Sequence, residues 1–530
     1  MKRLILISIF LLAFLLRFYD LAGNPPSLYW DEASLGYNAY SILKTARDEF
    51  GTFLPLTNFP AFGDYKPPGY IYADVAPIAV LGLNELAIRF PSALAGTLTI
   101  FAVYLLAKKI FKNEKIALFA TFFLAVSPWH LQLSRAAFEA NLALLFSTLG
   151  ILFFLSVEKK PYLIVLSAIS FILAMYTFTG QRLFVPFILL ILLFQFRNQI
   201  ITNWKITFLA GLLGLILFLP LLKFTAQTIE GKLRFNEVTI FKDLKPIDDS
   251  IRFREEDNFS LVANIIHNRR FFFVHEYLTH YFDAFNPSFL FVKGDVNPRL
   301  SIQEIGELYY FDALLVPLGI FLLLYRKQKY RFLVIGWLLV SPLGPATARE
   351  TPHALRMIHI LPTYQLISAF ALYGLARLVR FKKLFKSLCA LIIFVLIFYY
   401  LHMYYIHYPH DYQGQWQYGY KQAVEAVKPY LNKADNIVVT LALGRPYIYF
   451  LLYNQFDPAK FQKTAQVEKD KFFFINVTSF DKFHFSDEEI SYPPNTLFVK
   501  NPSHLPPNYT LIKNIEDMEG NTVFTVGLTN

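Results

Sequence analysis

Long apolar runs alternate with short polar segments through the first 406 residues, and this pattern predicts a helical membrane protein. Runs long enough to cross about 30 Å of hydrocarbon as helices occur at eleven places, namely 4–20, 86–107, 116–130, 140–157, 161–179, 183–196, 206–222, 308–325, 332–346, 355–378 and 387–406. The first is expected to be an uncleaved anchor, because Arg17 and Asp20 follow it without a small-residue cleavage site. A further stretch, 70–83, is short and contains Asp74 and Pro77. We expect it to be a juxtamembrane or re-entrant segment.

The basic residues predict the orientation of these spans. They cluster in every second loop, at Lys2/Arg3, Lys108/Lys109/Lys112/Lys115, Lys159/Lys160, Arg197/Lys205, Arg326/Lys327/Lys329/Arg331 and Arg377/Arg380/Lys382/Lys383/Lys386. Loops rich in lysine and arginine stay in the cytoplasm. The pattern predicts a multi-pass protein of the cell membrane, with a cytoplasmic N-terminus and an extracytoplasmic C-terminal part.

Two long outer loops and the C-terminal tail place most of the non-membrane residues on the outer side. The loops are 21–85 and 223–307, and the apolar content falls sharply after residue 406. Turn residues separate strand-like runs in the tail, at Asn436–Leu443, Lys471–Val477 and Asn495–Val499. We therefore expect two domains, a helical transmembrane domain at 1–406 and a small extracytoplasmic α/β domain at 407–530.

Composition narrows the function classes. Of the 530 residues, 55% are hydrophobic and 18% aromatic, which excludes an ordinary soluble domain. The net charge of +11 lies largely in the cytoplasmic loops and does not indicate a nucleic-acid partner. The single cysteine, Cys389, excludes a disulfide framework. Phosphate-binding loops, zinc-protease motifs and nucleophile elbows are all missing from the sequence. A divalent cation stays open as a cofactor, because carboxylates and carbonyls can bind one without a motif.

The strongest candidate site follows the first span. Asp31 and Glu32 are adjacent carboxylates near the membrane, where charges need a functional reason. Neighbours on a helix point about 100° apart, so we expect Asp31 to act as a general base and Glu32 to orient it. An acidic first turn of a helix is the alternative. Lys66 precedes two prolines, so it is either a rigidly held phosphate ligand or an ordinary interfacial lysine.

Other outer segments supply further candidates. Arg135 and Glu139 are spaced i,i+4, which predicts one helical face; Glu139 is either a second acid of the site or the ion-pair partner of Arg135. Arg356 and Arg182 lie at outer span ends and are candidate donor-phosphate ligands. The candidate substrate-binding residues are Tyr37, Tyr40, Asp64, Tyr65, Arg135 and His353.

These residues carry a resemblance to a known family. The Asp31-Glu32 pair, the Lys66-Pro67-Pro68 run and the segment 85–92 (Glu-Leu-Ala-Ile-Arg-Phe-Pro-Ser) resemble lipid-linked-sugar glycosyltransferases of the GT-C fold. The chain is similar to the bacterial protein O-mannosyltransferases (glycosyltransferase family 39) and to the aminoarabinose transferases. The segment 277–295 also looks like part of the sequence of a bacterial subgroup of this family. The resemblance implies that Asp31 is the base, Lys66 the donor-phosphate lysine and Glu139 the second acid. Two positions depart from the pattern: Tyr65 replaces a frequent Glu, and Glu139 replaces the usual Asp.

The resulting expectation is an inverting glycosyltransferase, transferring either a hexosyl or a pentosyl group. It would move a sugar from a polyprenyl-phosphate donor to a protein, lipid or glycan acceptor outside the cytoplasm. The alternative is a transporter or flippase of lipid-linked or amphipathic substrates. Transporters concentrate charges near the middle of the bilayer and often contain repeats. Here the charges lie at the outer ends of spans and no repeat is visible, so transfer is favoured.

Overall fold

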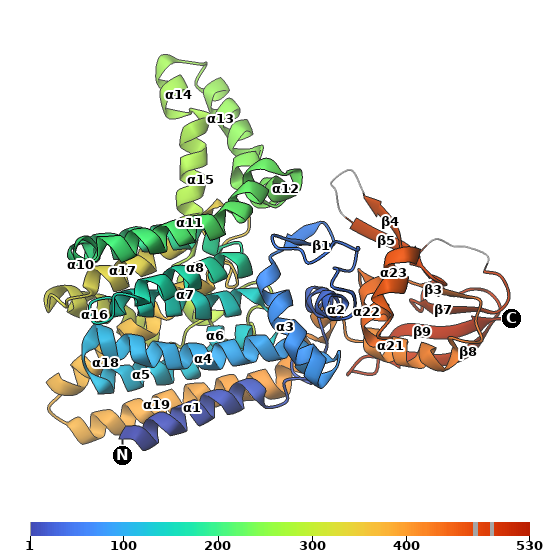
Figure 1. Cartoon of the computed structure of the whole chain (residues 1–530), viewed down its shortest axis with the longest axis horizontal. Helices are drawn as coiled ribbons and strands as arrows, with labels where there is room; N and C mark the ends of the chain where they lie inside the picture. Colours follow the sequence, from blue (N-terminus) through green and yellow to red (C-terminus); the bar gives the residue numbers. More distant parts are fainter. Residues whose placement is uncertain (1, 470–474, 488–491) are drawn as a thin grey trace. The chain divides into compact units, whose positions relative to one another are not determined.

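The computed structural model describes residues 2–469, 475–487 and 492–530, without the side chains of 233–237. Contacts divide the chain into two compact units, coloured along the sequence in Figure 1. Unit 1 comprises Met1–Arg17, Ala95–Ser134 and Glu139–Leu401. Unit 2 comprises Phe18–Leu94, Arg135–Phe138 and His402–Asn530. Each unit is described by itself.

Unit 1 is a helical bundle whose helices lie side by side in Figure 1. Its helices are α1 (Lys2–Phe18), α4 (Glu85–Phe111), α5 (Glu114–Ala125), α6 (Pro128–Arg135), α7 (Glu139–Ser156), α8 (Leu163–Thr177), α9 (Gln181–Gln195), α10 (Arg197–Thr202), α11 (Trp204–Gln227), α16 (Asp312–Tyr325), α17 (Arg331–Val340), α18 (Thr363–Leu378) and α19 (Lys382–His402). Each of the eleven expected spans overlaps one of them.

Five described helical segments are long and apolar enough to cross a membrane, at Glu85–Phe111, Glu139–Ser156, Trp204–Gln227, Ile358–Leu378 and Lys382–Asp411. The pair α5 and α6, bent by 53°, makes a sixth if it is one broken span. The other expected spans fall on shorter helices, so the number eleven stays a prediction. These apolar helices indicate a multi-pass membrane protein.

Burial within unit 1 separates central helices from peripheral ones. In an apolar stretch of 18 residues, 72% of α7 and 89% of Ile358–Leu378 are buried. The corresponding values for α11 and Lys382–Asp411 are 11% and 6%. Exposed apolar helices suit a lipid environment. In the centre, a Cβ on Gly319 would lie 2.5 Å from the Ile367 carbonyl oxygen. Only glycine allows α16 and α18 to approach this closely.

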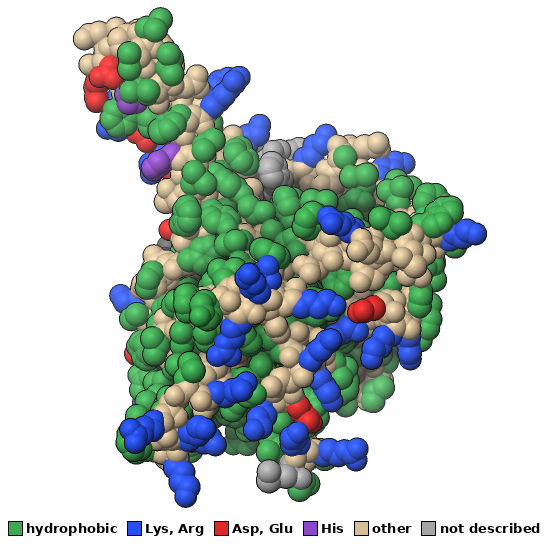
Figure 2. Space-filling view, turned by 90° about the vertical axis from the view of Figure 1, so that its left-hand side faces the viewer, with side chains coloured by type: hydrophobic (Ala, Val, Ile, Leu, Met, Phe, Trp, Pro, Cys, Tyr) green, Lys and Arg blue, Asp and Glu red, His purple; other side chains and the backbone are tan. Residues whose placement is uncertain are grey.

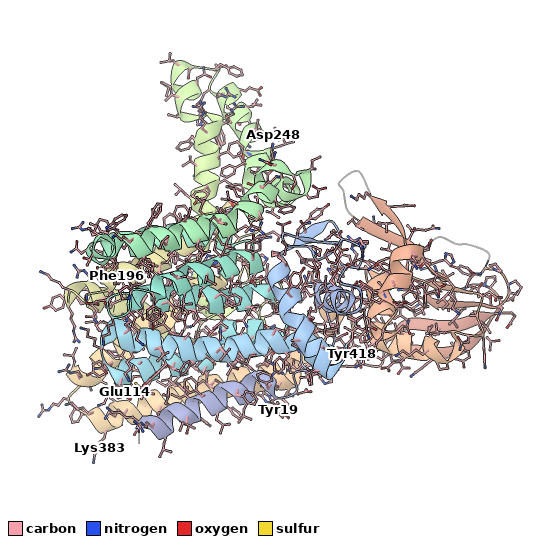
Figure 3. All side chains as sticks on the ribbon, viewed as in Figure 1. Tyr19, Glu114, Phe196, Asp248, Lys383 and Tyr418 are labelled. Atoms are coloured by element: carbon pink, nitrogen blue, oxygen red, sulfur yellow. The ribbon has the colours of Figure 1, made fainter. Side chains whose placement is uncertain are left out.

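One end of the bundle is strongly basic. Figure 2 shows the face at this end, where lysine and arginine side chains far outnumber acidic ones. Glu114, Phe196 and Lys383, labelled in Figure 3, lie at the same end. The basic loops that the sequence assigns to the cytoplasm thus gather on one side of unit 1. The orientation in the membrane stays a prediction.

A helical arm leaves the bundle between α11 and α16. It contains α12 (Ile229–Val238), η1 (Ile240–Lys242), α13 (Lys245–Glu256), α14 (Leu261–Ile266) and α15 (Arg269–Asp283). Figure 1 shows it projecting sideways from the bundle helices. A short π-helix, η2 (Ser288–Val292), follows it. The arm therefore accounts for most of the second long loop, 223–307.

Unit 2 combines the first outer loop with an α/β region. The loop forms α2 (Trp30–Thr45), the hairpin β1 (Phe59–Ala61) and β2 (Asp64–Lys66), and α3 (Pro68–Leu81). The 14 residues of α3 extend about 21 Å at 1.5 Å per residue, which is short for a span. The re-entrant assignment of 70–83 stays a prediction.

The C-terminal part of unit 2 contains a seven-stranded sheet with the order β4-β5-β6-β3-β7-β9-β8. Its strands are β3 (Asn436–Val439), β4 (Gln466–Lys469), β5 (Ile475–Phe480), β6 (Phe483–Phe485), β7 (Thr496–Lys500), β8 (Tyr509–Glu516) and β9 (Thr522–Thr529). The central strand β3 is parallel to both of its neighbours, and every other pairing is antiparallel. The helices of this part include α21 (Tyr420–Val427), α22 (Pro446–Tyr453) and α23 (Pro458–Thr464). Of the expected strand Lys471–Val477, residues 471–474 lie outside the described residues.

The contacts group the loop 21–85 with the C-terminal sheet, whereas the sequence assigned it to the transmembrane domain. Tyr37 on α2 donates a hydrogen bond to the Phe456 carbonyl, and Tyr449 on α22 donates one to the Leu28 carbonyl. Because residues so far apart in sequence make these contacts, no local pattern predicts them. The boundary between 406 and 407 stays a prediction.

Candidate functional site

The predicted base and the predicted phosphate lysine are in direct contact. Asp31 lies in the first turn of α2, and Lys66 ends strand β2. The Lys66 Nζ is 3.0 Å from the Asp31 Oδ1 and 3.4 Å from the Asp64 Oδ2. The Lys66 side chain is only 10% exposed, whereas that of Asp31 is 36% exposed. A held cation thus lies beside a carboxylate that solvent or a substrate can reach.

The local sequence explains how Lys66 is held. The β1–β2 hairpin pairs Phe59 with Lys66 and Ala61 with Asp64. Pro67 caps α3 and Pro68 is its first residue, a position where the missing N–H of proline has no consequence. The hairpin and the helix start therefore restrict the backbone on both sides of the lysine.

Glu32 has a different environment from Asp31. Its carboxylate accepts hydrogen bonds from the Arg89 Nε at 3.0 Å, the Arg89 Nη2 at 3.1 Å and the Ala137 N–H at 2.8 Å. Glu32 and Arg89 are both buried, and Arg89 also donates to the carbonyls of Leu21, Pro25 and Ser27. This geometry favours Glu32 as a residue that fixes the start of α2.

Arg135 and Glu139 do not share a helix, so the predicted i,i+4 face is wrong. Helix α6 ends at Arg135, and α7 begins at Glu139. The buried Arg135 donates from Nε to the Tyr404 hydroxyl at 3.1 Å and from Nη2 to the Asp20 and Asn24 carbonyls. Residues 136–138 interrupt the helix, and the i,i+4 spacing alone could not reveal this break. Glu139 belongs to unit 1, and its catalytic role stays a proposal.

Two of the other predicted substrate-binding residues in unit 2, Tyr37 and Tyr65, have packing roles. Tyr37 is fully buried, and burial raises the pKa of its hydroxyl. Tyr65 is buried as well, and its N–H donates to the Asp64 Oδ1 at 2.8 Å. Tyr40 is half-buried, with Lys44 over its ring. Of these residues, Asp64 and Tyr40 retain the exposure that a substrate contact needs.

In unit 1, the predicted His353 and Arg356 lie in a loop that Asp295 anchors. The Asp295 Oδ2 accepts from the Ala354 N–H at 2.6 Å and lies 3.9 Å from the His353 Nδ1. Burial raises the pKa of Asp295 to about 6. Arg356 donates to the Glu350 carbonyl at 3.0 Å, and its side chain is 22% exposed. Asp295 therefore has a structural role, the anchoring of this loop, that its position in the sequence did not reveal.

Arg182 is at the start of α9. It donates from Nη1 to the Thr225 hydroxyl at 3.4 Å and from Nε to the Met175 carbonyl at 3.4 Å. Its role as a phosphate ligand stays a proposal. Across the parts of the chain that the structure describes, no three His, Cys, Asp or Glu side chains cluster in a way that could hold a metal ion.

Two residues of unit 2 were missed by sequence reasoning. Arg89 lies inside the segment 85–92 that carries the family resemblance, whereas no local sequence pattern singles out Arg445. Arg445 has φ +50°, and its guanidinium donates to the Asn476 Oδ1 at 2.6 Å and lies 5.4 Å from the Phe62 ring centroid. At its neighbour Gly444 (φ +73°), a Cβ would lie 3.0 Å from the Trp30 ring. The loop after β3 thus reaches the residue next to Asp31.

The comparisons with known proteins agree with this fold. Residues 65–224 match the family model described as dolichyl-phosphate-mannose-protein mannosyltransferase. No curated protein sequence matches the chain. The structure resembles ArnT from Cupriavidus metallidurans in the apo state, with 12% identity, a TM-score of 0.56, and coverage of 99% of this chain and 97% of ArnT.

Two further solved structures are similar. ArnT bound to undecaprenyl phosphate gives 11% identity and a TM-score of 0.57, and the match covers 98% of this chain and 97% of ArnT. The oligosaccharyltransferase AglB from Archaeoglobus fulgidus, in complex with an inhibitory peptide and a dolichol-phosphate, gives 15% identity and a TM-score of 0.51. That match covers 85% of this chain, which spans only 63% of AglB. The chain therefore has the GT-C glycosyltransferase fold, and the resemblance to the protein O-mannosyltransferase and aminoarabinose transferase group is confirmed.

Proposed function

We propose that the chain is an inverting glycosyltransferase that uses a polyprenyl-phosphate sugar and acts on the extracytoplasmic side of the membrane. The observation that carries the proposal is the contact between Asp31 and Lys66, whose Oδ1 and Nζ are 3.0 Å apart. The relatives support the donor class, because ArnT and AglB were both solved with a polyprenyl phosphate. The basic loops of unit 1 support the assignment of the outer side.

In the proposed reaction, the acceptor oxygen or nitrogen attacks the anomeric carbon of the donor. The carbon–oxygen bond to the phosphate breaks, and the polyprenyl phosphate leaves with the bonding electrons. Asp31 takes the proton of the acceptor as a general base, a role worth typically 10²–10⁴ in rate. Lys66 stabilises the negative charge that grows on the leaving phosphate. A single displacement of this kind inverts the anomeric centre.

The roles of the neighbouring residues follow from their contacts. Glu32 and Arg89 hold the start of α2, so that Asp31 keeps its position. Asp64 shares Lys66 with Asp31 and keeps the lysine directed toward the site. The loop at Gly444–Arg445, which meets Trp30 and Phe62, is proposed to lie on the acceptor side. The sugar and the acceptor would then be selected by separate parts of unit 2.

The experiment is a donor screen. Membranes containing the protein are incubated with a panel of polyprenyl-phosphate sugars, each radiolabelled in the sugar, and loss of the labelled lipid is measured. The proposal predicts that one donor class is consumed and its label appears in an acceptor with the opposite anomeric configuration. Movement of intact labelled lipid across the membrane, without cleavage, would instead indicate a flippase.

A further inference from the structure

Helix α15 of the arm exposes its apolar side. Its outward-facing residues include Phe271, Val274, Leu278 and Phe282, which are 57%, 56%, 46% and 63% exposed. Their spacing of three and four residues places them in one stripe along the helix. We call these four residues the outer stripe. A helix of a water-soluble protein buries such a stripe, so this one needs an apolar environment.

A neighbouring side of α15 is the one attached to the bundle. Tyr277 and Tyr281 donate hydrogen bonds to the carbonyls of Leu343 and Leu339, at 3.0 and 2.8 Å. The His280 Nδ1 lies 2.8 Å from the Ala348 carbonyl. Tyr277, His280 and Tyr281 thus contact protein, whereas the outer stripe faces outward with the exposed His275 and Thr279 beside it.

These contacts also place α15 at a particular depth. Residues 339–348 include the end of α17 opposite to Arg331, which begins this helix in a basic loop. If that basic loop is cytoplasmic, α15 is attached at the outer boundary of the bundle. Figure 1 shows α15 running across the direction of α4, α7 and α11. A helix that crosses the membrane-spanning helices at their outer ends runs along the membrane surface.

The neighbouring part of the arm extends the apolar surface. The short helix α14 exposes Leu261, Val262 and Ile265. Next to the stripe lies a hollow of about 660 Å³. Four apolar residues line it, Leu278, Phe282, Phe285 and Pro287, together with four polar ones, His275, Thr279, Asp283 and Asn286. Acidic residues of the arm include Asp248 and Glu255 on α13, and Glu276 and Asp283 on α15 itself. The stripe itself carries no charge, which suits an uncharged apolar partner.

We propose that the arm is an interfacial anchor whose outer stripe inserts into the headgroup–acyl boundary of the outer leaflet. Interfacial helices bury an apolar face at this depth and keep their polar groups out of the acyl chains. Tyrosines at the same level fit the usual preference of aromatic residues for the interface. The arm then fixes the segment 339–351, which it contacts, relative to the membrane surface. This inference goes beyond the transfer reaction and does not depend on it.

Depth-dependent fluorescence quenching tests the proposal. Cys389 is replaced by alanine, and single cysteines are introduced as Val274→Cys, Leu278→Cys and, as the control, Asp248→Cys. Asp248 is exposed on α13, and Figure 3 labels it. Each variant is labelled with a polarity-sensitive dye and reconstituted into phosphatidylcholine vesicles. Quenching is measured with nitroxide-bearing lipid and, separately, with aqueous iodide.

The stripe positions should emit at shorter wavelength than the control, and should be quenched by the nitroxide lipid but protected from iodide. The dye at the control position should show the opposite response. Two stripe positions are used, so that one poorly folding variant leaves the other to report. Strong iodide quenching at the stripe would overturn the proposal in favour of a solvated arm. Protection from both quenchers would overturn it in favour of a second protein, including another copy of this chain. Neither readout uses sugar transfer, so this test is independent of the donor screen.

Discussion

The buried pair of Glu32 and Arg89 should carry much of the stability around Asp31, the proposed base. In Arg89→Met, Glu32 loses two hydrogen bonds of 3.0 and 3.1 Å, and three backbone carbonyls lose a donor. Breaking a buried ion pair by removing one partner costs about 3–5 kcal/mol, because the remaining charge stays buried without compensation. For a unit of 150–250 residues, 1 kcal/mol shifts Tm by about 2–4 °C. The expected decrease in the apparent Tm is therefore about 6–20 °C.

The assay is thermal unfolding of purified protein, followed by tryptophan fluorescence. The matched control is Lys460→Met, which breaks a 2.7 Å pair with Asp481 whose side chains are 50% and 28% exposed. An exposed pair is worth about 0–1 kcal/mol, so the control should change little. The double variant Glu32→Gln/Arg89→Met should lose less stability than the sum of the single variants, because it leaves neither charge alone. If Arg89→Met shifts the Tm no more than Lys460→Met does, the reasoning about the buried pair is refuted.

Three further predictions test other parts of the account. Lys66→Ala should lower kcat and weaken donor binding by about 1.5–3 kcal/mol, or roughly ten- to a hundredfold, and Lys66→Arg should recover only part of the loss. The acceptor KM should stay unchanged in both variants. Titrations of donor and acceptor on purified enzyme check this, and an effect confined to the acceptor KM would contradict it. Burial raises the pKa of Glu49 to about 8, so between pH 6 and pH 8 the folded state holds a proton that the unfolded state has lost, and the free energy of unfolding should fall by about 2–3 kcal/mol from pH 6 to pH 9. Glu49→Gln should flatten this pH dependence in unfolding curves. An unchanged slope of the free energy of unfolding against pH would exclude Glu49 as its source. In intact cells, an impermeant thiol reagent should label Asp248→Cys and spare Lys327→Cys, and labelling of the latter would reverse the orientation.

The sequence predicted those features that depend on local pattern. Apolar run lengths located the bundle helices, and the proline pair after Lys66 indicated a rigid position that the helix start at Pro68 supports. The separation of roles between Asp31 and Glu32 followed from the angle between adjacent helical residues. In the structure, these two side chains contact different cations, Lys66 and Arg89. Each of these inferences needed only a few neighbouring residues.

The features that the sequence did not reveal depend on contacts between distant segments. The break between α6 and α7 puts Arg135 and Glu139 on different helices, although their spacing suggested one face. Arg135 also has distant partners, Tyr404, Asp20 and Asn24. Likewise, nothing in its neighbourhood marked Arg445, whose partners Asn476 and Phe62 come from other elements. Tertiary contacts of this kind decide which polar residues are available to a substrate.

The most direct test of the account compares two carboxylates that contact the same lysine. Asp31→Asn and Asp64→Asn each remove one negative charge within 3.4 Å of the Lys66 Nζ, but only Asp31 is proposed to be the base. With the donor that the screen identifies, the initial rate of sugar transfer is measured for both purified variants at saturating donor. The account predicts that Asp31→Asn loses about 10²–10⁴ in kcat with donor binding nearly intact, whereas Asp64→Asn retains most of the wild-type kcat. A kcat close to wild type in Asp31→Asn would contradict the central claim.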